Sequence, residues 1–185
     1  NIASLLNEAE WDRSARAILA RKFPLGGVAW PYAVFMTATS RPTGFDTDLE
    51  SFLGPYGSFA GPAAVQRGAL AGTKTRGFSL IAALQFDVAL SAGGEWRTEI
   101  VTGIAPSGTA AATAKTWTAA ARVARAREEN RSHWMSISPG PFEVRTGDAL
   151  WDPFLNIWLK KQIRTCCDWG RSATYYHEGV GTFGF

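Results

Sequence analysis

Apolar side chains alternate with more polar ones along residues 78–91, and a second alternation runs from residue 96 to residue 104. The segment 92–94, Ala-Gly-Gly, separates the two. Alternation at every second residue is typical of a strand with one buried face, and a short glycine turn between two such strands favours a β-hairpin. We therefore predict a long antiparallel hairpin over about residues 77–104.

Three segments predict helices that pack against this sheet. Ser4 can cap a helix over about residues 4–22, although its apolar side chains fall on two opposite sides instead of forming one stripe. An alanine-rich segment predicts a helix at about 110–130. A third helix, at about 153–167, follows Asp152 and carries its basic residues near its end. The expected fold class is α+β, with helices packed on an antiparallel sheet.

Residues 40–72 are rich in glycine and proline and predict a long loop, interrupted at most by a short helix around residues 48–53. A loop of this length is uncommon in a compact domain unless the segment has a function or a partner. We find no internal repeat or linker, so we expect residues 1–185 to form a single domain.

The composition is that of an ordinary globular chain: 185 residues, 46% apolar and 19% charged. The formal net charge of +3 is too small to imply a nucleic-acid or membrane partner by itself. The longest uncharged stretch, residues 23–40, contains prolines and glycines, so we expect no spanning helix. A secretory signal is also absent, and since the chain begins with Asn1 we expect a processed or trimmed product. No compartment follows from these features.

The sequence predicts neither a metal site nor a cofactor. Its two histidines, His133 and His177, have no partner at metal-ligand spacing, and no phosphate-binding loop motif is found. Asp46, Asp48 and Glu50 could present oxygens to a hard cation, but the glycine and the downstream glutamate of a calcium loop are missing. We favour helix capping by Asp48 and solvation of the other two.

One metal-free acid/base set is conceivable, formed by His177 and Glu99 with Arg97 or Arg145 as helpers. In such a site the carboxylate would take a proton from a ribose hydroxyl and the imidazolium would protonate the leaving oxygen. The arginine would stabilise the phosphorane. This set would suit a secreted, metal-independent nuclease, which we keep as an alternative function.

The preferred hypothesis is a non-enzymatic structural subunit of a larger assembly, such as a viral or phage shell, that acts through contacts with identical or different protein subunits. It rests on apolar and aromatic side chains near the two ends of the chain. The candidate interface residues are Leu5, Leu6, Trp11, Tyr175, Tyr176, Phe183 and Phe185. A second alternative is a membrane-active protein that inserts the first helix, and a nucleic-acid partner is a minor hypothesis.

Overall fold

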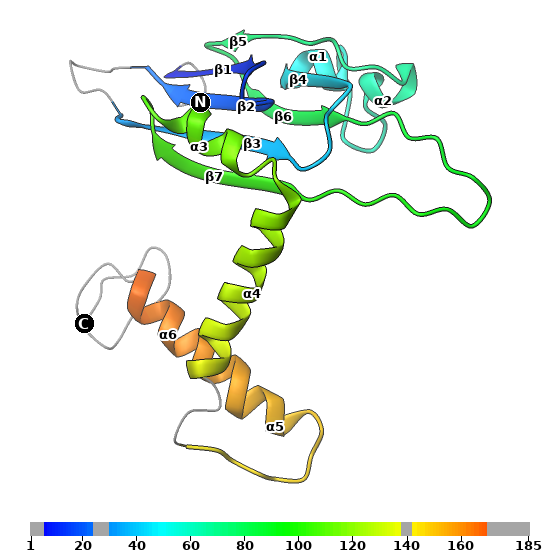
Figure 1. Ribbon diagram of the computed structural model, residues 1–185. Helices are drawn as coiled ribbons and strands as arrows, with labels where there is room; N and C mark the ends of the chain where they lie inside the picture. The colour runs from blue at the N-terminus through cyan, green and yellow to red at the C-terminus, as the bar shows by residue number, and fades with distance from the viewer. Residues whose placement is uncertain (1–5, 24–29, 138–141, 170–185) are drawn as a thin grey trace. The chain divides into compact units, whose positions relative to one another are not determined.

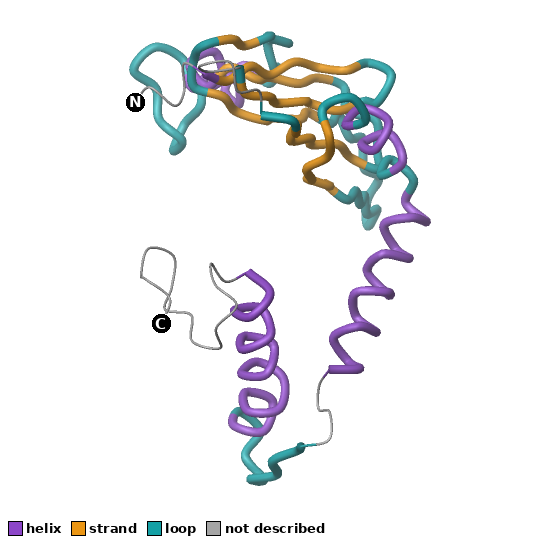
Figure 2. Tube along the Cα trace, turned by 90° about the vertical axis from the view of Figure 1, so that its left-hand side faces the viewer, coloured by secondary structure: helices purple, strands orange, loops and turns teal. Residues whose placement is uncertain are grey.

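The structure is a computed structural model that describes residues 6–23, 30–137 and 142–169, with side chains up to residue 165 in the last segment. The chain divides into two compact units, residues 1–123 and residues 124–185. All the described strands lie in the first unit, whereas the described part of the second consists of helix and loop (Figure 2). A single domain over residues 1–185 stays a prediction.

The described strands of the first unit form two antiparallel sheets (Figure 1). They are β1 (Asn7–Asp12), β2 (Ala17–Lys22), β3 (Tyr32–Ala38), β4 (Gly44–Asp48), β5 (Thr75–Arg76), β6 (Leu80–Gln85) and β7 (Ile100–Pro106). The larger sheet has the order β5-β1-β2-β3-β7, and β4 pairs with β6 in the smaller one. Together with the helices, these sheets confirm the predicted α+β class with antiparallel pairing.

The helices follow the prediction in the second half of the chain. They are α1 (Leu49–Leu53), α2 (Ala63–Arg67), α3 (Ala110–Thr116), α4 (Ala120–Ile137), α5 (Trp151–Pro153), the π-helical turn η2 (Phe154–Trp158) and α6 (Leu159–Trp169). The helix predicted at 110–130 is confirmed as α3 and α4, and the one predicted at 153–167 lies within the continuous run from α5 to α6. No helix in the described segments combines the length and apolar character needed to cross a bilayer.

The predicted helix at 4–22 is wrong, because this segment forms β1 and β2. The two strands pair antiparallel from Asn7 opposite Lys22 to Asp12 opposite Ala17. Three consecutive residues of β2, Ala17 to Leu19, are buried because β2 is an inner strand covered on both faces. Burial on two faces explains why the apolar side chains fail to form one helical stripe.

The predicted hairpin over 77–104 is also wrong, since its two strands belong to different sheets. β6 pairs with β4, and β7 pairs with β3 so that Val34 lies opposite Ile104. The chain does turn at Ser91, whose carbonyl accepts a hydrogen bond from the Gly94 N–H (2.9 Å). The described segment between β6 and β7 nevertheless forms no strand and extends away from the sheets (Figure 1). Alternation identified strand-forming residues but could not identify their partners.

Helix α3 covers one face of the larger sheet and closes the main core around Phe35. The other buried members of this core are small, apart from one leucine: Ala15, Ala17, Leu19, Ala33, Ala105, Ala110 and Ala114. Alanine on both the helix and the sheet lets the two layers approach closely. Phe35 lies opposite Gly103 on β7, which leaves room for the phenyl ring.

In the second unit, Asn156 joins the segment 142–150 to the helix that follows. Asn156 is 8% exposed, its Oδ1 accepts the Val144 N–H (2.8 Å), and its Nδ2 donates to the Val144 carbonyl (2.7 Å). Large apolar side chains of this unit remain exposed. Among the described residues they are Met135, Phe142, Leu150, Trp151, Phe154, Ile157, Trp158, Leu159 and Ile163.

Replacing Gly103 by alanine should destabilise the first unit by about 1–3 kcal/mol. The new Cβ would lie 2.5 Å from the Phe35 ring, so either the ring or β7 must shift. Gly108→Ala is the matched control, because a Cβ there meets no described atom within 4 Å. Urea unfolding of both variants checks the prediction, and equal free energies of unfolding would contradict it.

Candidate functional site

The candidate site is a cavity of about 320 Å³ beside α1, in the glycine-rich and proline-rich segment of the sequence. Its walls include Asp48 and Glu50 at the start of α1, Tyr56 in the loop that follows, and Phe78 just before β6. The N–H of Leu49 donates to the carbonyl of Ser79 (3.1 Å), which fixes the start of α1 to this strand.

Capping residues define both ends of α1. Asp48 is the N-cap, and its carboxylate accepts the Ser51 N–H at 2.7 Å. At the other end Gly54 adopts a φ of +83°, which glycine tolerates without strain, and its N–H donates to the Glu50 carbonyl (2.8 Å). The predicted capping role of Asp48 is confirmed, and the short helix predicted around 48–53 is present.

Three side chains of this cavity are available to a ligand. The side chain of Tyr56 is fully exposed, and that of Phe78 is 65% exposed. The backbone of Tyr56 has a φ of +55°, which residues other than glycine rarely adopt. The Glu50 carboxylate makes no hydrogen bond or ion pair with any residue that the structure describes. Apolar ring surfaces beside a free carboxylate suit a ligand that presents both C–H and O–H groups. We call Glu50, Tyr56 and Phe78 the α1 surface.

The α1 surface rests on a fully buried carboxylate, that of Asp46. Its Oδ1 accepts the Thr47 N–H (3.0 Å) and the hydroxyl of Thr73. Its Oδ2 accepts the hydroxyl of Ser51 on α1 (3.4 Å) and the Ala71 N–H (3.3 Å). A buried charge is tolerated when it is fully hydrogen-bonded, and here its donors come from the helix, β4 and the loop before β5.

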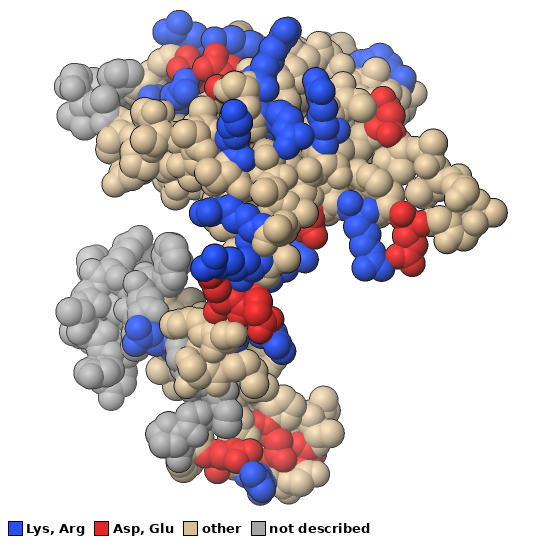
Figure 3. Space-filling model, viewed as in Figure 1, with Lys and Arg blue, Asp and Glu red and all other residues tan. Residues whose placement is uncertain are grey.

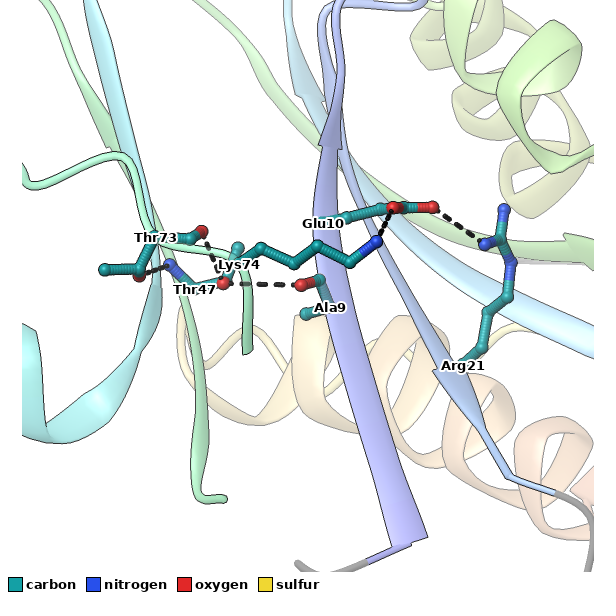
Figure 4. A network of polar contacts seen from close by, with 6 residues as sticks. All are labelled: Ala9, Glu10, Arg21, Thr47, Thr73 and Lys74. Atoms are coloured by element: carbon teal, nitrogen blue, oxygen red, sulfur yellow. Dashed lines mark hydrogen bonds and ion pairs between the residues drawn. The ribbon is translucent and has the colours of Figure 1, made fainter. Parts of the chain in front are cut away.

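Thr47 continues this network into the larger sheet (Figure 4). Its hydroxyl lies 2.8 Å from the Thr73 carbonyl, 2.9 Å from the hydroxyl of Thr75 on β5 and 3.4 Å from the carbonyl of Ala9 on β1. A hydroxyl carries one proton, so it donates to the nearer carbonyl and accepts from Thr75. A β-bulge between Asp46 and Asp48 turns two successive side chains inward, which a regular strand does not do.

An ion-pair cluster lies on the same strand β1 (Figure 4). Glu10 accepts from Lys74 (2.6 Å) and from Arg21 (3.0 Å), and these contacts connect β1 to β2 and to the segment before β5. The hydrogen bond from Lys74, together with the positive charges of both cations, lowers the pKa of Glu10 against the opposing effect of burial. The charged form is therefore the form that the fold stabilises.

The structure describes three members of the predicted acid/base set, and each of them has a polar partner outside the set. Arg97 donates to Glu95 (2.6 Å) on the exposed loop, and Glu99 accepts the hydroxyl of Thr39 (2.8 Å). Arg145 lies in the second unit, where it pairs with Glu143. His177 lies outside the described residues.

The predicted interface residues divide in the same way. Leu6 is half-buried, and Trp11 is half-buried and stacks on Phe45 of β4 at a centroid distance of 5.0 Å. Leu5 and the four aromatic residues at the other end (Tyr175, Tyr176, Phe183 and Phe185) lie outside the described residues. Their role in contacts between subunits stays a prediction.

Within the described segments no group of three or more His, Cys, Asp or Glu side chains is placed to hold a metal ion. Asp46 and Asp48 are instead committed to backbone and hydroxyl donors. Sequence analysis missed Tyr56 and Phe78 as site residues. The signal that pointed to Tyr56 was the long glycine-rich and proline-rich segment, which is uncommon without a function, whereas Phe78 lies outside it.

Comparison with known proteins decides the family. Residues 2–141 match the family model of the glycosyl hydrolase 94 supersandwich domain. The chain belongs to this family. The match includes the whole α1 surface and all of helix α4 but not the helices from α5 onward.

Similar relatives of this supersandwich domain are phosphorylases. It is 34% identical to the 3-O-β-D-glucopyranosyl-β-D-glucuronide phosphorylase of Paenibacillus borealis, over 64% of this chain and 15% of that protein. It is 26% identical to the N,N'-diacetylchitobiose phosphorylase of Vibrio furnissii, over 80% of this chain and 18% of that protein. It is 28% identical to the solabiose phosphorylase of P. borealis, over 75% of this chain and 18% of that protein. The chain thus spans less than one fifth of the length of these relatives.

Membership of a glycosyl hydrolase family corrects the preferred hypothesis of the sequence analysis. A non-enzymatic structural subunit of a shell or similar assembly is wrong, because the family and its relatives are carbohydrate-active enzymes. The error has a physical origin. Apolar residues on two sides of a supposed first helix suggested contacts with neighbours, whereas Ala9 of β1 and Ile18 and Leu19 of β2 are buried within the chain.

Replacing Asp46 by asparagine should lower the free energy of unfolding by about 2–4 kcal/mol. The amide that replaces one carboxylate oxygen cannot accept from its neighbouring donors, and the remaining bonds lose their charge. Asp87→Asn is the control, because Asp87 is exposed and accepts only from Gln85 among the described residues. Chemical unfolding of the two variants checks this, and equal losses would show that burial of Asp46 is not important.

Glu10→Gln should reduce the stability of the first unit at neutral pH but not in acid. Because the pKa of Glu10 is lowered on folding, its contribution is present above the pKa of an unfolded glutamate and is lost as the pH falls through the folded value. The stability gap between wild type and variant should therefore close on acidification. Thermal unfolding across this pH range measures the gap, and a gap independent of pH would contradict the assignment.

Proposed function

We propose that the chain serves as the supersandwich domain of a phosphorylase that cleaves a disaccharide with inorganic phosphate. The observation that carries this proposal is the family match over residues 2–141, together with the similarity to relatives that are named as phosphorylases. The matched segments are 15–18% of those relatives, and the proposal places the catalytic groups in the remainder of such an enzyme.

The contribution of this chain is to contact the saccharide through the α1 surface. Tyr56 and Phe78 offer exposed aromatic faces to the C–H groups of a sugar ring, and Glu50 offers acceptors to its hydroxyls. The Asp46 network supports this function, because it holds α1 in place before any ligand arrives. The reaction itself requires no acid or base from these three residues.

A chimera tests the proposal. The segment of the P. borealis glucuronide phosphorylase that matches this chain is replaced by the corresponding residues of this chain, and release of sugar 1-phosphate is measured with each of the three relatives' disaccharides. Activity with at least one disaccharide is expected. A folded chimera that is inactive with all three would contradict the proposed function.

In the active chimera, Tyr56→Ala should lower kcat/KM for the disaccharide by about fivefold to tenfold, mainly through KM, because an aromatic contact is worth roughly 1 kcal/mol. Phe59→Ala is the matched control, since Phe59 is also an exposed aromatic residue of the same loop but does not line the cavity. If the chimera does not fold, disaccharides are titrated into the 185-residue chain and NMR shifts of Tyr56 and Phe78 are followed. Equal losses of kcat/KM at Tyr56 and Phe59, or the absence of NMR shifts on titration, would contradict saccharide binding by the α1 surface.

A further inference from the structure

A second cavity, of about 230 Å³, lies at the turn between β1 and β2. Its walls are Trp11, Arg13, Arg16, Arg41 and Pro42, which we call the arginine pocket. The first three come from β1 and the turn after it, and the other two come from the segment between β3 and β4. Several Lys and Arg side chains lie on the face of the first unit seen in Figure 3. The lining of the arginine pocket contains three arginines and no described carboxylate.

The three guanidinium groups of the arginine pocket have no partner among the residues that the structure describes, neither a hydrogen bond nor an ion pair. Acidic side chains nearby in sequence are already engaged. Glu10 binds two other cations, and Asp12 accepts the hydroxyl of Ser14 (2.7 Å) and the N–H of Ala15 (2.8 Å). The positive charge that converges on this pocket is therefore not neutralised by ion pairs within the described chain.

The backbone that carries these arginines is held in a defined shape. Arg16 has a φ of +52°, in the left-handed region where glycine or asparagine is usual. Its carbonyl accepts the hydroxyl of Thr37 (2.9 Å), a fully buried residue of β3, and the Asp12 carboxylate closes the turn from the other side. The turn therefore holds the backbone of Arg16 in one conformation beside the pocket.

We propose that the arginine pocket binds an oxyanion, the phosphate or carboxylate group of a small ligand. Guanidinium groups bind both oxyanions through pairs of parallel hydrogen bonds, and an anion would relieve the repulsion among three cations. The indole of Trp11 supplies an apolar wall for the part of the ligand that carries the anion. This site shares no lining residue with the α1 cavity, and its existence does not depend on the proposed phosphorylase function.

Titration of the 185-residue chain with inorganic phosphate, glucose 1-phosphate and glucuronate tests the proposal, with glucose as the neutral control. At least one anion should bind and shift the indole N–H resonance of Trp11, and added salt should weaken the binding. Arg13→Gln and Arg41→Gln should each lower the affinity by about tenfold or more. Arg67→Gln is the matched control, because Arg67 is an exposed arginine on α2 outside the pocket.

The anions identify the source of the ligand. Binding of both phosphate compounds without glucuronate supports a phosphoryl group, and binding of glucuronate alone supports a carboxylate. The proposal is overturned if none of the anions binds up to about 10 mM, which corresponds to a negligible affinity. It is also overturned if glucose binds as tightly as the anions, or if Arg67→Gln weakens binding as much as Arg41→Gln while all variants keep the wild-type melting temperature.

Discussion

The fold of the first unit depends on one buried polar network, that of Asp46 and Thr47. A carboxylate without contact to solvent is stable only if donors surround it, and here the donors come from β4, α1 and the loop before β5. The hydroxyl of Thr47 extends the network to the hydroxyl of Thr75 on β5, so the smaller sheet is joined to the larger one by a directional bond. The position of α1, and with it of the α1 surface, follows from this connection.

The class of fold could be predicted from the sequence because it depends on local patterns. The alternation of apolar and polar side chains predicted the residues of β6 and β7, and the high alanine content predicted α3 and α4. Strand pairing could not be predicted in the same way, because the pairing of β7 with β3 joins residues more than sixty positions apart and no local turn specifies it. The first two strands were mistaken for a helix because β2 is buried on both faces, which removes the alternation.

The candidate site could be predicted only as a region. The glycine-rich and proline-rich segment was expected to have a function, and Asp48 was expected to cap a helix, but nothing marked Tyr56 or Phe78 as exposed. Their exposure results from the backbone of the loop after α1 and from the two-sheet packing, which depends on Asp46. The expected solvation of Asp46 was wrong, because the bulge in β4 directs this side chain inward to hydroxyl and amide donors.

Native-state hydrogen exchange tests most directly whether this network unites the two sheets. The amides of Thr47 and Ala71, which donate to the Asp46 carboxylate, are compared with the amide of Leu19 in the centre of the larger sheet. If the network joins the sheets, all three amides should exchange through the same global unfolding with the same free energy of opening. Exchange of Thr47 and Ala71 at a clearly lower free energy than Leu19 would show that the smaller sheet opens by itself and would contradict the account.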